Sequence, residues 1–248
     1  MKIAKLVSVA MLAVAFLAGC FESKISILVK KDGSGTVTNT ITLPPRLLGM
    51  VVIDDSGKIF DEVELKKAEG ELGEGVKFVS VEELAKKADG SRVFVAVYSF
   101  EDIGKVKFSD SEQDGMLPYV FKLEKGEASS KLTITLMMSD VVAPQPPASD
   151  EEEKAQEKAQ IKDSLGGAKM MFEVKFDGEI TKADASYYDK DQKTVQLMDM
   201  DFDKAMANPE NTDKILDIIR SKDFRGFYAM KDIPGVKFEK KKVEVEFK

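Results

Sequence analysis

"ISILVKKDGSGTVTNTITLP", residues 25–44, is the stretch of the sequence that decides the fold. Its first half alternates apolar and polar residues from Ile25, and its second half alternates apolar residues with threonines up to Leu43. A period of two residues predicts a strand with one buried face. Asp32, Gly33 and Gly35 supply the positive φ that a tight turn requires. The stretch therefore predicts an antiparallel β-hairpin.

Strand patterns recur along the rest of the chain, with unrelated helical segments between them. We expect a second hairpin over 116–138. Further strands are expected over 75–81, 91–100, 168–180, 193–202 and 235–248. Both faces of the 91–100 segment are apolar, which predicts a central place in the sheet. Helices are expected over 82–88 and after the capping pair Asn208-Pro209. This order predicts an α+β fold with a mainly antiparallel sheet that is curved or nearly closed.

The composition changes over residues 139–167. Three prolines in "VVAPQPPAS" (141–149) predict a semi-rigid extended spacer. Ser149 and Glu152 then form a capping box for an acidic helix with a thin apolar face, which Gly166 and Gly167 can end. We therefore expect one α+β domain over 24–248, interrupted at about 139–167 by a proline-rich linker and a surface helix.

The N-terminus combines a positive start, a short apolar run and the only cysteine of the chain. Lys2 and Lys5 precede an apolar run that is shorter than the roughly 20 residues needed to span a bilayer. Small residues then lead to Cys20. This order predicts a secretory signal peptide over residues 1–19.

The stretch "LAGC" (17–20) resembles the lipobox of bacterial lipoproteins. The resemblance implies cleavage between Gly19 and Cys20, a diacylglyceryl group on the Cys20 sulfur, and acylation of the new amino terminus. Residues 20–23 would then be a lipidated anchor segment, tethered to a membrane surface by several acyl chains. Phe21 stands where an aspartate would favour the inner membrane, so we expect the outer membrane, facing the periplasm, in a Gram-negative cell. The alternative is an ordinary signal peptide that leaves a free thiol.

The composition makes several classes of activity improbable. The formal charge of −7 without a basic stripe disfavours nucleic-acid binding. The absence of histidine removes Ser-His-Asp and Cys-His catalysis and nearly all zinc sites. Glycine-rich phosphate-binding and dinucleotide-binding motifs are also absent from the sequence. An enzyme would have only carboxylate, lysine or tyrosine chemistry, and we expect no catalytic residue and no cofactor.

The segment "DMDFDKAMANPE" (199–210) partly matches a calcium-binding EF-hand loop. Asp199, Asp201, Asp203 and Glu210 occupy loop positions 1, 3, 5 and 12. Position 6, which needs glycine for its sharp turn, is Lys204. We therefore expect a strand whose aspartates face water, with Asp203 capping the next turn, and no metal site.

Lysines 240–242 in "EKKKVEVEFK" (239–248) could contact anionic headgroups. Three glutamates dilute this charge, which favours an exposed edge strand protected by lysines. Six methionines on the predicted strands suit an adaptable apolar pocket, although methionines also fill ordinary cores: Met137, Met138, Met170, Met171, Met198 and Met200.

Several motifs together resemble the LppM-like class of bacterial envelope lipoproteins. They are the lipobox, "DGSGTVT" (32–38), "VYSFEDIGKVKF" (97–108) and "FEVKFDGEITKADASYYDKDQKTVQLMDMDF" (172–202). Asp177 replaces an expected proline, and no tryptophan ends the 193–202 strand. The resemblance implies an α+β domain associated with lipid or the cell envelope, and it supplies no catalytic residue.

Three functional hypotheses follow. The first is a non-enzymatic envelope lipoprotein, held in the membrane through acylated Cys20, that binds a lipid or another envelope component. The second is a carboxylate-dependent hydrolase of cell-wall glycans, and the third is a structural or assembly partner of envelope proteins. An apolar cavity would favour the lipid-binding hypothesis, and two facing carboxylates would favour the hydrolase. A flat exposed apolar patch would favour the assembly partner.

Overall fold

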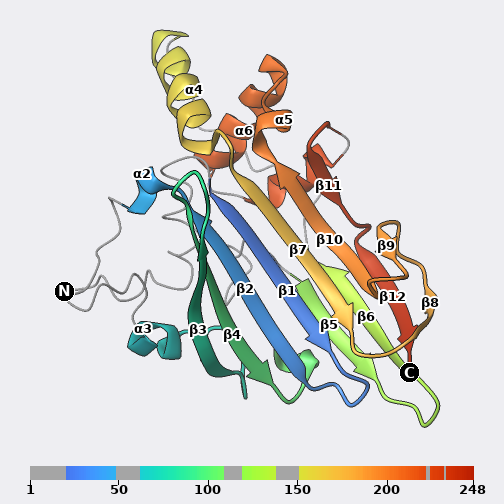
Figure 1. Cartoon of the computed structure of the whole chain (residues 1–248). Coiled ribbons are helices and arrows are strands. Elements are labelled where there is room, and N and C mark those ends of the chain that lie inside the picture. The colour runs from blue at the N-terminus through green and yellow to red at the C-terminus, as the bar shows by residue number, and fades with distance from the viewer. Residues whose placement is uncertain (1–20, 49–61, 109–118, 138–150, 222–223, 232) are drawn as a thin grey trace.

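A computed structural model describes residues 21–48, 62–108, 119–137, 151–221, 224–231 and 233–248. The described chain forms two β-sheets with helices gathered mostly at one end (Figure 1). One sheet has eight strands and the other four, and most strand pairs are antiparallel. The predicted α+β class is confirmed, and the sheets do not close into a barrel.

The hairpin predicted from residues 25–44 is confirmed. Strand β1 (Glu22–Val29) pairs antiparallel with β2 (Gly35–Leu43), and Ile27 lies opposite Val37. Gly33 has a φ of 87°, which side-chain-bearing residues rarely adopt. The Asp32 carboxylate accepts hydrogen bonds from the backbone N–H and the hydroxyl of Ser34 at 2.9 and 2.7 Å, and these bonds close the turn.

The eight-stranded sheet is built around this hairpin. Its order is β11-β10-β7-β1-β2-β4-β3, and β9 pairs with β10. Strand β1 pairs with β7 in parallel, which joins a late strand to the first one. The remaining strands are β3 (Lys77–Lys86), β4 (Arg92–Phe100), β7 (Lys169–Phe176), β9 (Tyr188–Asp189), β10 (Thr194–Asp201) and β11 (Val236–Phe238).

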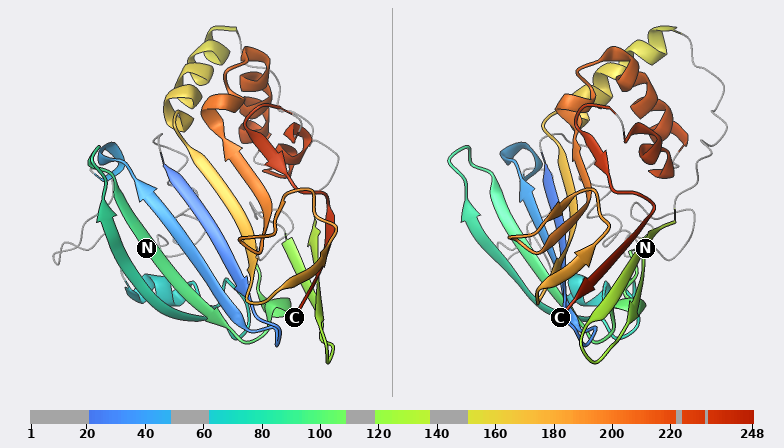
Figure 2. Two further views of the ribbon diagram at one scale, coloured as in Figure 1. Left: turned by 45° about the vertical axis from the view of Figure 1, so that its right-hand side comes forward. Right: turned by 90° about the vertical axis from the view of Figure 1, so that its right-hand side faces the viewer.

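The smaller sheet has the order β5-β6-β12-β8 and packs against one face of the larger sheet (Figure 2). The ring of Phe172 lies 5.0 Å from that of Tyr119, and the ring of Phe176 lies 4.8 Å from that of Phe247. We call this face of the larger sheet the inner face and the opposite one the outer face. The strands are β5 (Tyr119–Glu124), β6 (Ser130–Leu136), β8 (Ile180–Ala183) and β12 (Lys242–Phe247).

Most of the helices lie at the end of the larger sheet where β7 begins and β10 ends (Figure 1). Buried Ile215, Leu216 and Ile218 give α6 an apolar face, and the Asn208 side chain accepts the Glu210 N–H at 3.0 Å. None of the described helices is long and apolar enough to cross a membrane. The helices are α2 (Pro45–Leu48), α3 (Glu62–Lys67), α4 (Glu151–Leu165), α5 (Phe202–Ala205) and α6 (Pro209–Ser221), with 3₁₀ turns η2 (Ile103–Lys105) and η3 (Phe224–Met230).

The acidic helix predicted after the proline-rich segment is present as α4. Its side chains at Ala155, Ala159 and Lys162 are exposed, and Leu165 is buried where the helix meets the sheet. Helix α4 is therefore a surface helix, as its thin apolar face predicts. The predicted linker over 139–150 lies outside the described residues.

Three sequence-based expectations are wrong. Residues 82–86 continue β3 instead of forming a helix, because pairing with β4 overrides their helical propensity, and the register shifts at Val79 and Leu84 accommodate them. Strand β4 lies second from the edge instead of centrally, and its Val95 is only half-buried. The 235–248 segment divides into β11 and β12, which belong to different sheets.

Candidate functional site

The predicted cleavage and lipidation residues, Gly19 and Cys20, lie outside the described residues, but the fold begins immediately after them. Phe21 is fully buried, and its carbonyl oxygen accepts the Lys169 N–H at 2.8 Å. Strand β1 starts at the next residue, Glu22. Phe21–Ser23 of the segment predicted as the anchor (20–23) are therefore already part of the packed domain, which begins directly after Cys20.

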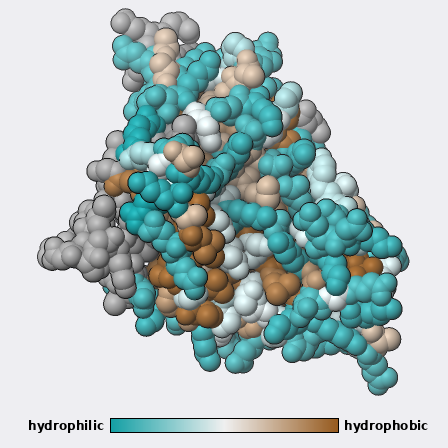
Figure 3. All heavy atoms as spheres, in the orientation of Figure 1, coloured by the Kyte–Doolittle hydropathy of each residue, from teal (hydrophilic) through white to brown (hydrophobic). Residues whose placement is uncertain are grey.

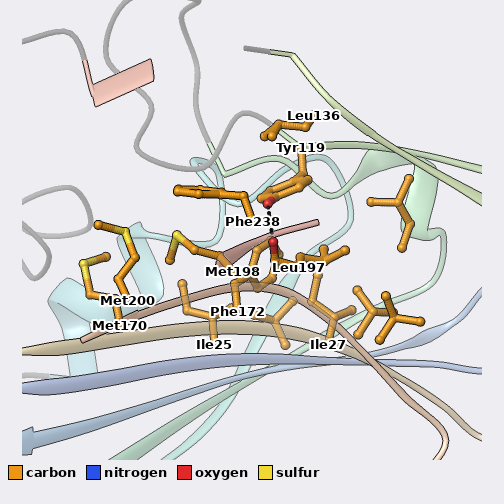
Figure 4. Packing of buried hydrophobic residues seen from close by; sticks show 14 of the residues in the cluster. Ile25, Ile27, Tyr119, Leu136, Met170, Phe172, Leu197, Met198, Met200 and Phe238 are labelled. Atoms are coloured by element: carbon orange, nitrogen blue, oxygen red, sulfur yellow. Dashed lines mark hydrogen bonds between the residues drawn. The ribbon is translucent and has the colours of Figure 1, made fainter. Parts of the chain in front are cut away.

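Three of the six methionines named from the sequence come together on the inner face, close to the start of β1. Met170 and Met200 lie directly opposite each other on β7 and β10, and Met198 lies opposite Phe172. Figure 4 shows the three side chains pointing into the space between the sheets, close to Phe238. Each of the three residues is only 3% exposed. We call Met170, Met198 and Met200 the methionine cluster.

The other three methionines do not join this cluster. Met171 is half-buried on the outer face, where it lies opposite Asp199. Met137 is 57% exposed at the end of β6, and Met138 lies outside the described residues. Alternation on β7 and β10 therefore brings three of the six methionines, Met170, Met198 and Met200, to one face.

Asn39 is a polar residue in the same cross-strand row of the inner face. It lies between Ile25 of β1 and Ala96 of β4, and the row continues from Ile25 through Phe172 to Met198. The side-chain oxygen of Asn39 is buried and accepts no hydrogen bond from any described residue. A buried acceptor without a partner costs about 1–3 kcal/mol, so its retention on an apolar face calls for an explanation.

Sequence reasoning missed Asn39, although its position could have revealed it. In β2, apolar residues at 37, 41 and 43 face inward, and the alternation places position 39 on the same face. A polar side chain at one inward position of an otherwise apolar strand marks either a hydrogen-bonded core or a site that contacts a ligand. In the structure, no described residue supplies the hydrogen bond that a core position would need.

The chemistry of this inner face suits binding. Tyr119, a phenol beside this face, donates its hydroxyl to the Leu197 carbonyl at 3.2 Å (Figure 4). Burial raises the pKa of Tyr119 well above its usual value of 10, so the phenol stays neutral. These residues are packed between the two sheets, and an apolar lining with one amide and adaptable methionines is typical of sites for apolar ligands. We take the methionine cluster, Asn39 and the residues between them as the candidate site.

The outer face carries a nearly buried carboxylate, Glu173, that pairs with two lysines. Glu173 accepts the Ser26 hydroxyl at 2.8 Å and lies 3.0 and 3.2 Å from the ammonium groups of Lys24 and Lys175. Its side chain is only 8% exposed. Burial alone would raise its pKa, but these hydrogen bonds and charges outweigh burial and lower the pKa below 4.5. A general acid needs a raised pKa, so Glu173 is poorly suited to protonating a glycosidic oxygen.

The remainder of the outer face is mostly hydrophilic, as Figure 3 shows. Hydrophobic side chains gather over β3 and β4 in this view. The exposed or half-buried apolar residues of these two strands include Val79 and Leu84, which are 56% and 59% exposed, and Val93, Val95 and Val97. Since Val79 and Leu84 lie at the two register shifts of β3, their exposure follows from the irregular edge strand.

The residues that match an EF-hand loop take separate structural roles. Asp199 on β10 lies 3.9 Å from the Lys237 ammonium group. Asp201 caps α5 by accepting the Lys204 N–H at 3.2 Å, and Glu210 lies in the first turn of α6. Among the described residues, no three acidic or thiol side chains are grouped so that they could hold a metal ion.

The capping role predicted for Asp203 belongs instead to Asp201. Asp203 accepts the Gly167 N–H at 2.8 Å, which ties α5 to the chain segment that follows α4. The difference arises because β10 ends one residue before α5 begins at Phe202, so Asp201 occupies the N-cap position.

Lysines 240–242 form no joint basic patch. The Lys240 ammonium lies 2.8 Å from Asp184, Lys241 stacks over the Tyr228 ring at 5.6 Å, and Lys242 lies 2.8 Å from Glu244. The expected edge strand is also wrong, because β12 lies between β6 and β8 inside the smaller sheet. The lysines therefore pair with neighbouring side chains instead of protecting an edge.

Comparisons with known proteins yield one similarity. No protein-family model and no curated protein matches the chain. The chain is similar to the NMR structure of the folded domain of the LppM protein from Mycobacterium tuberculosis, with 11% sequence identity and a TM-score of 0.36. The similarity covers 93% of this chain and 91% of that chain. The resemblance expected from the sequence motifs thus reappears as a weak structural similarity.

Proposed function

We propose that this chain is a non-enzymatic lipoprotein of the bacterial envelope, anchored through acylated Cys20, whose inner face binds an acyl chain of a membrane lipid. The lipobox-like LAGC stretch supports the anchor. The methionine cluster supports an apolar ligand, since methionine side chains adapt to ligands of varied shape. Lipid is the most abundant partner at the surface to which such an anchor would hold the domain.

The observation that carries the proposal is the unpartnered oxygen of Asn39 on the inner face. Asn39 shares a cross-strand row with Met198, so one ligand could contact both residues. A lipid hydroxyl or amide group could donate a hydrogen bond to Asn39 while its acyl chain lies along the methionine cluster. Sites of this kind combine a mostly apolar lining with a few polar groups that orient the ligand.

Photo-methionine, a diazirine analogue of similar shape, tests the proposal in cell membranes. The full chain would be produced with this analogue at every methionine, illuminated, digested and mapped by mass spectrometry. We expect intact-lipid adducts on Met170, Met198 or Met200. Met137, which is 57% exposed, controls for nonspecific contact with lipid at the protein surface. Met206, which is buried next to α5, controls for the effect of burial alone.

Two outcomes would contradict lipid binding at this site. Adducts at Met137 that equal or exceed those of the methionine cluster would indicate only surface contact with the membrane. Cross-links from the cluster to protein alone would indicate an ordinary core. The mass of each adduct separates a free lipid from the acyl chains of Cys20, because the latter join two peptides of the same chain.

A further inference from the structure

The expected anchor, Cys20, lies so close to the fold that it restricts how the domain can meet the membrane. Phe21 follows Cys20 directly, and neighbouring Cα atoms are about 3.8 Å apart across a trans peptide bond. Because Phe21 is fully buried and hydrogen-bonded to Lys169, no flexible spacer separates Cys20 from the fold. An acylated Cys20 at the headgroup level would therefore hold the nearest part of the domain against the bilayer.

The topology identifies that part of the domain. Glu22 at the start of β1 lies opposite both Thr42 at the end of β2 and Lys169 at the start of β7. Lys169 in turn lies opposite Asp201 at the end of β10. These four strand ends lie side by side at one end of the sheet. We call this end, marked by Glu22, Thr42, Lys169 and Asp201, the anchor end.

Hairpin turns and the C-terminus lie at the opposite end. Lys31 in the β1–β2 turn donates to the Glu127 carbonyl in the β5–β6 turn at 2.7 Å, so these two turns are adjacent. The C-terminal residue, Lys248, pairs with Glu179 in the β7–β8 turn. Since β1 has eight residues, roughly 26 Å separate this far end from the anchor end.

We propose that the domain docks on the lipid bilayer through the anchor end, with the turns of the far end directed away from the membrane. This inference rests on the proposed acylation of Cys20. Helix α4 projects beyond the strand ends in Figures 1 and 2, so a bilayer that meets Cys20 also meets α4. Its exposed side chains include Gln160 and Lys162, which suit the headgroup layer and not the hydrocarbon core.

The charges at the anchor end indicate that docking depends on the acyl chains and not on acidic lipids. Lys87 lies 2.8 Å from Glu22, Arg46 lies 3.2 Å from Asp163, and Lys204 lies 2.9 Å from Asp201. Lys169 likewise lies between Glu22 and Asp201 on the neighbouring strands. Because each of these four cations has an acidic neighbour, they do not form a basic cluster of the kind that binds anionic headgroups. Docking should therefore change little with salt concentration or with the fraction of anionic lipid.

The test uses the mature lipidated protein in phosphatidylcholine vesicles that contain a headgroup-linked nitroxide quencher. Acylation would leave Cys20 without a free thiol, so a single added cysteine could carry a fluorophore. Ala88→Cys places it in the exposed β3–β4 turn at the anchor end, Gln160→Cys on α4, and Glu127→Cys in the far-end turn. We expect strong quenching at the first two positions and background quenching at the third, in low and high salt.

A linker variant provides the matched control. Inserting roughly ten glycine and serine residues between Cys20 and Phe21 adds a flexible tether of about 18 Å. Quenching at Ala88→Cys should fall in this variant, while the protein still floats with the vesicles. Equal quenching at Ala88→Cys and Glu127→Cys without the linker would overturn the proposed orientation and favour docking through the outer face.

Flotation separates the two proposals. Protein that floats but shows equal quenching at both ends contradicts only the docking proposal. Protein that fails to float although its fold is intact by circular dichroism contradicts the anchor itself and, with it, the docking proposal.

Discussion

The backbone N–H of Lys169 lies 2.8 Å from the carbonyl oxygen of Phe21, and this bond ties the second residue after the expected cleavage site to the start of β7. The same short region of the sheet contains Met170, which lies opposite Ser23. The expected anchor therefore lies close to the Met170 end of the candidate lipid site. This proximity links the two halves of the proposed function.

Cys20→Ser should abolish lipid modification and leave an unprocessed or soluble protein, because the serine oxygen cannot replace the thiol in the expected diacylglyceryl transfer. Metabolic labelling with a tagged fatty acid measures the modification. The wild-type chain should carry the label, and continued labelling of the serine variant would refute the lipobox interpretation.

Glu173→Gln should lower the free energy of unfolding by about 1–3 kcal/mol at neutral pH, because the variant leaves Lys24 and Lys175 without their shared carboxylate. Glu179→Gln is the control, since the Glu179 side chain is 65% exposed beside Lys248 and surface pairs contribute little. Urea unfolding at 25 °C measures both variants. An equal effect of the two substitutions would contradict the importance of the Glu173 network.

The contribution of Glu173 should also depend on pH. Because its pKa in the folded protein lies below the ordinary value of 4.5, ionised Glu173 favours the folded state above that value. Its stabilising effect should be complete near neutral pH and fade as the pH falls through the folded-state pKa. Wild type and Glu173→Gln should therefore converge in stability in acid, and a constant difference down to the acid transition would contradict this origin.

Tyr119→Phe should lower stability by about 1 kcal/mol, or about 2–4 °C in melting temperature, because it removes a buried hydrogen bond to the Leu197 carbonyl. Tyr98→Phe is a matched control, since the Tyr98 hydroxyl makes a longer bond of 3.4 Å to Leu65. Differential scanning calorimetry compares the two. A larger loss for Tyr98→Phe would show that the Tyr119 bond between the sheets matters less than its burial suggests.

Calcium should not bind tightly to the 199–210 segment, because Asp199, Asp201 and Asp203 each serve a different structural contact. Isothermal titration calorimetry with calcium should give no micromolar binding. Asp201→Ala should instead cost about 1 kcal/mol of stability through loss of the α5 cap, and Asp201→Asn should retain much of it. Micromolar calcium affinity that disappears in Asp201→Ala would overturn this interpretation.

The hairpins could be predicted because the residues that determine them are close together in the sequence. The alternation around Ile25 predicts both strands of the β1–β2 hairpin, and Gly33 supplies the positive φ of its turn. The positive φ expected at Asp32 and Gly35 is absent, because Gly35 already belongs to β2. The start of α6 was equally local, since Asn208 caps it and Pro209 fits its first position. In each case neighbouring residues supply the partners that the backbone needs.

The errors concern features set by distant partners. Residues 82–86 have helical propensity, but pairing with β4 keeps them in β3. Strand β12 could not be distinguished from an edge strand, because its neighbours β6 and β8 lie far away in the sequence. The ion-pair network of Glu173 was also hidden, since Lys24 reaches it only through the parallel pairing of β1 and β7.

Lipid binding at the inner face is tested most directly by comparing Asn39→Val with Thr38→Val. The two neighbouring residues of β2 face opposite sides of the sheet, so Thr38 controls for a polar-to-apolar change on the outer face. The lipid bound per mole of purified protein is measured by mass spectrometry, together with the melting temperature after lipid removal. We expect Asn39→Val to weaken lipid binding about five-fold, through loss of about 1 kcal/mol of hydrogen bonding, and to raise the lipid-free melting temperature. Thr38→Val should leave lipid binding unchanged. Unaltered lipid binding in Asn39→Val, or no bound lipid in the wild-type protein, would contradict the proposed function.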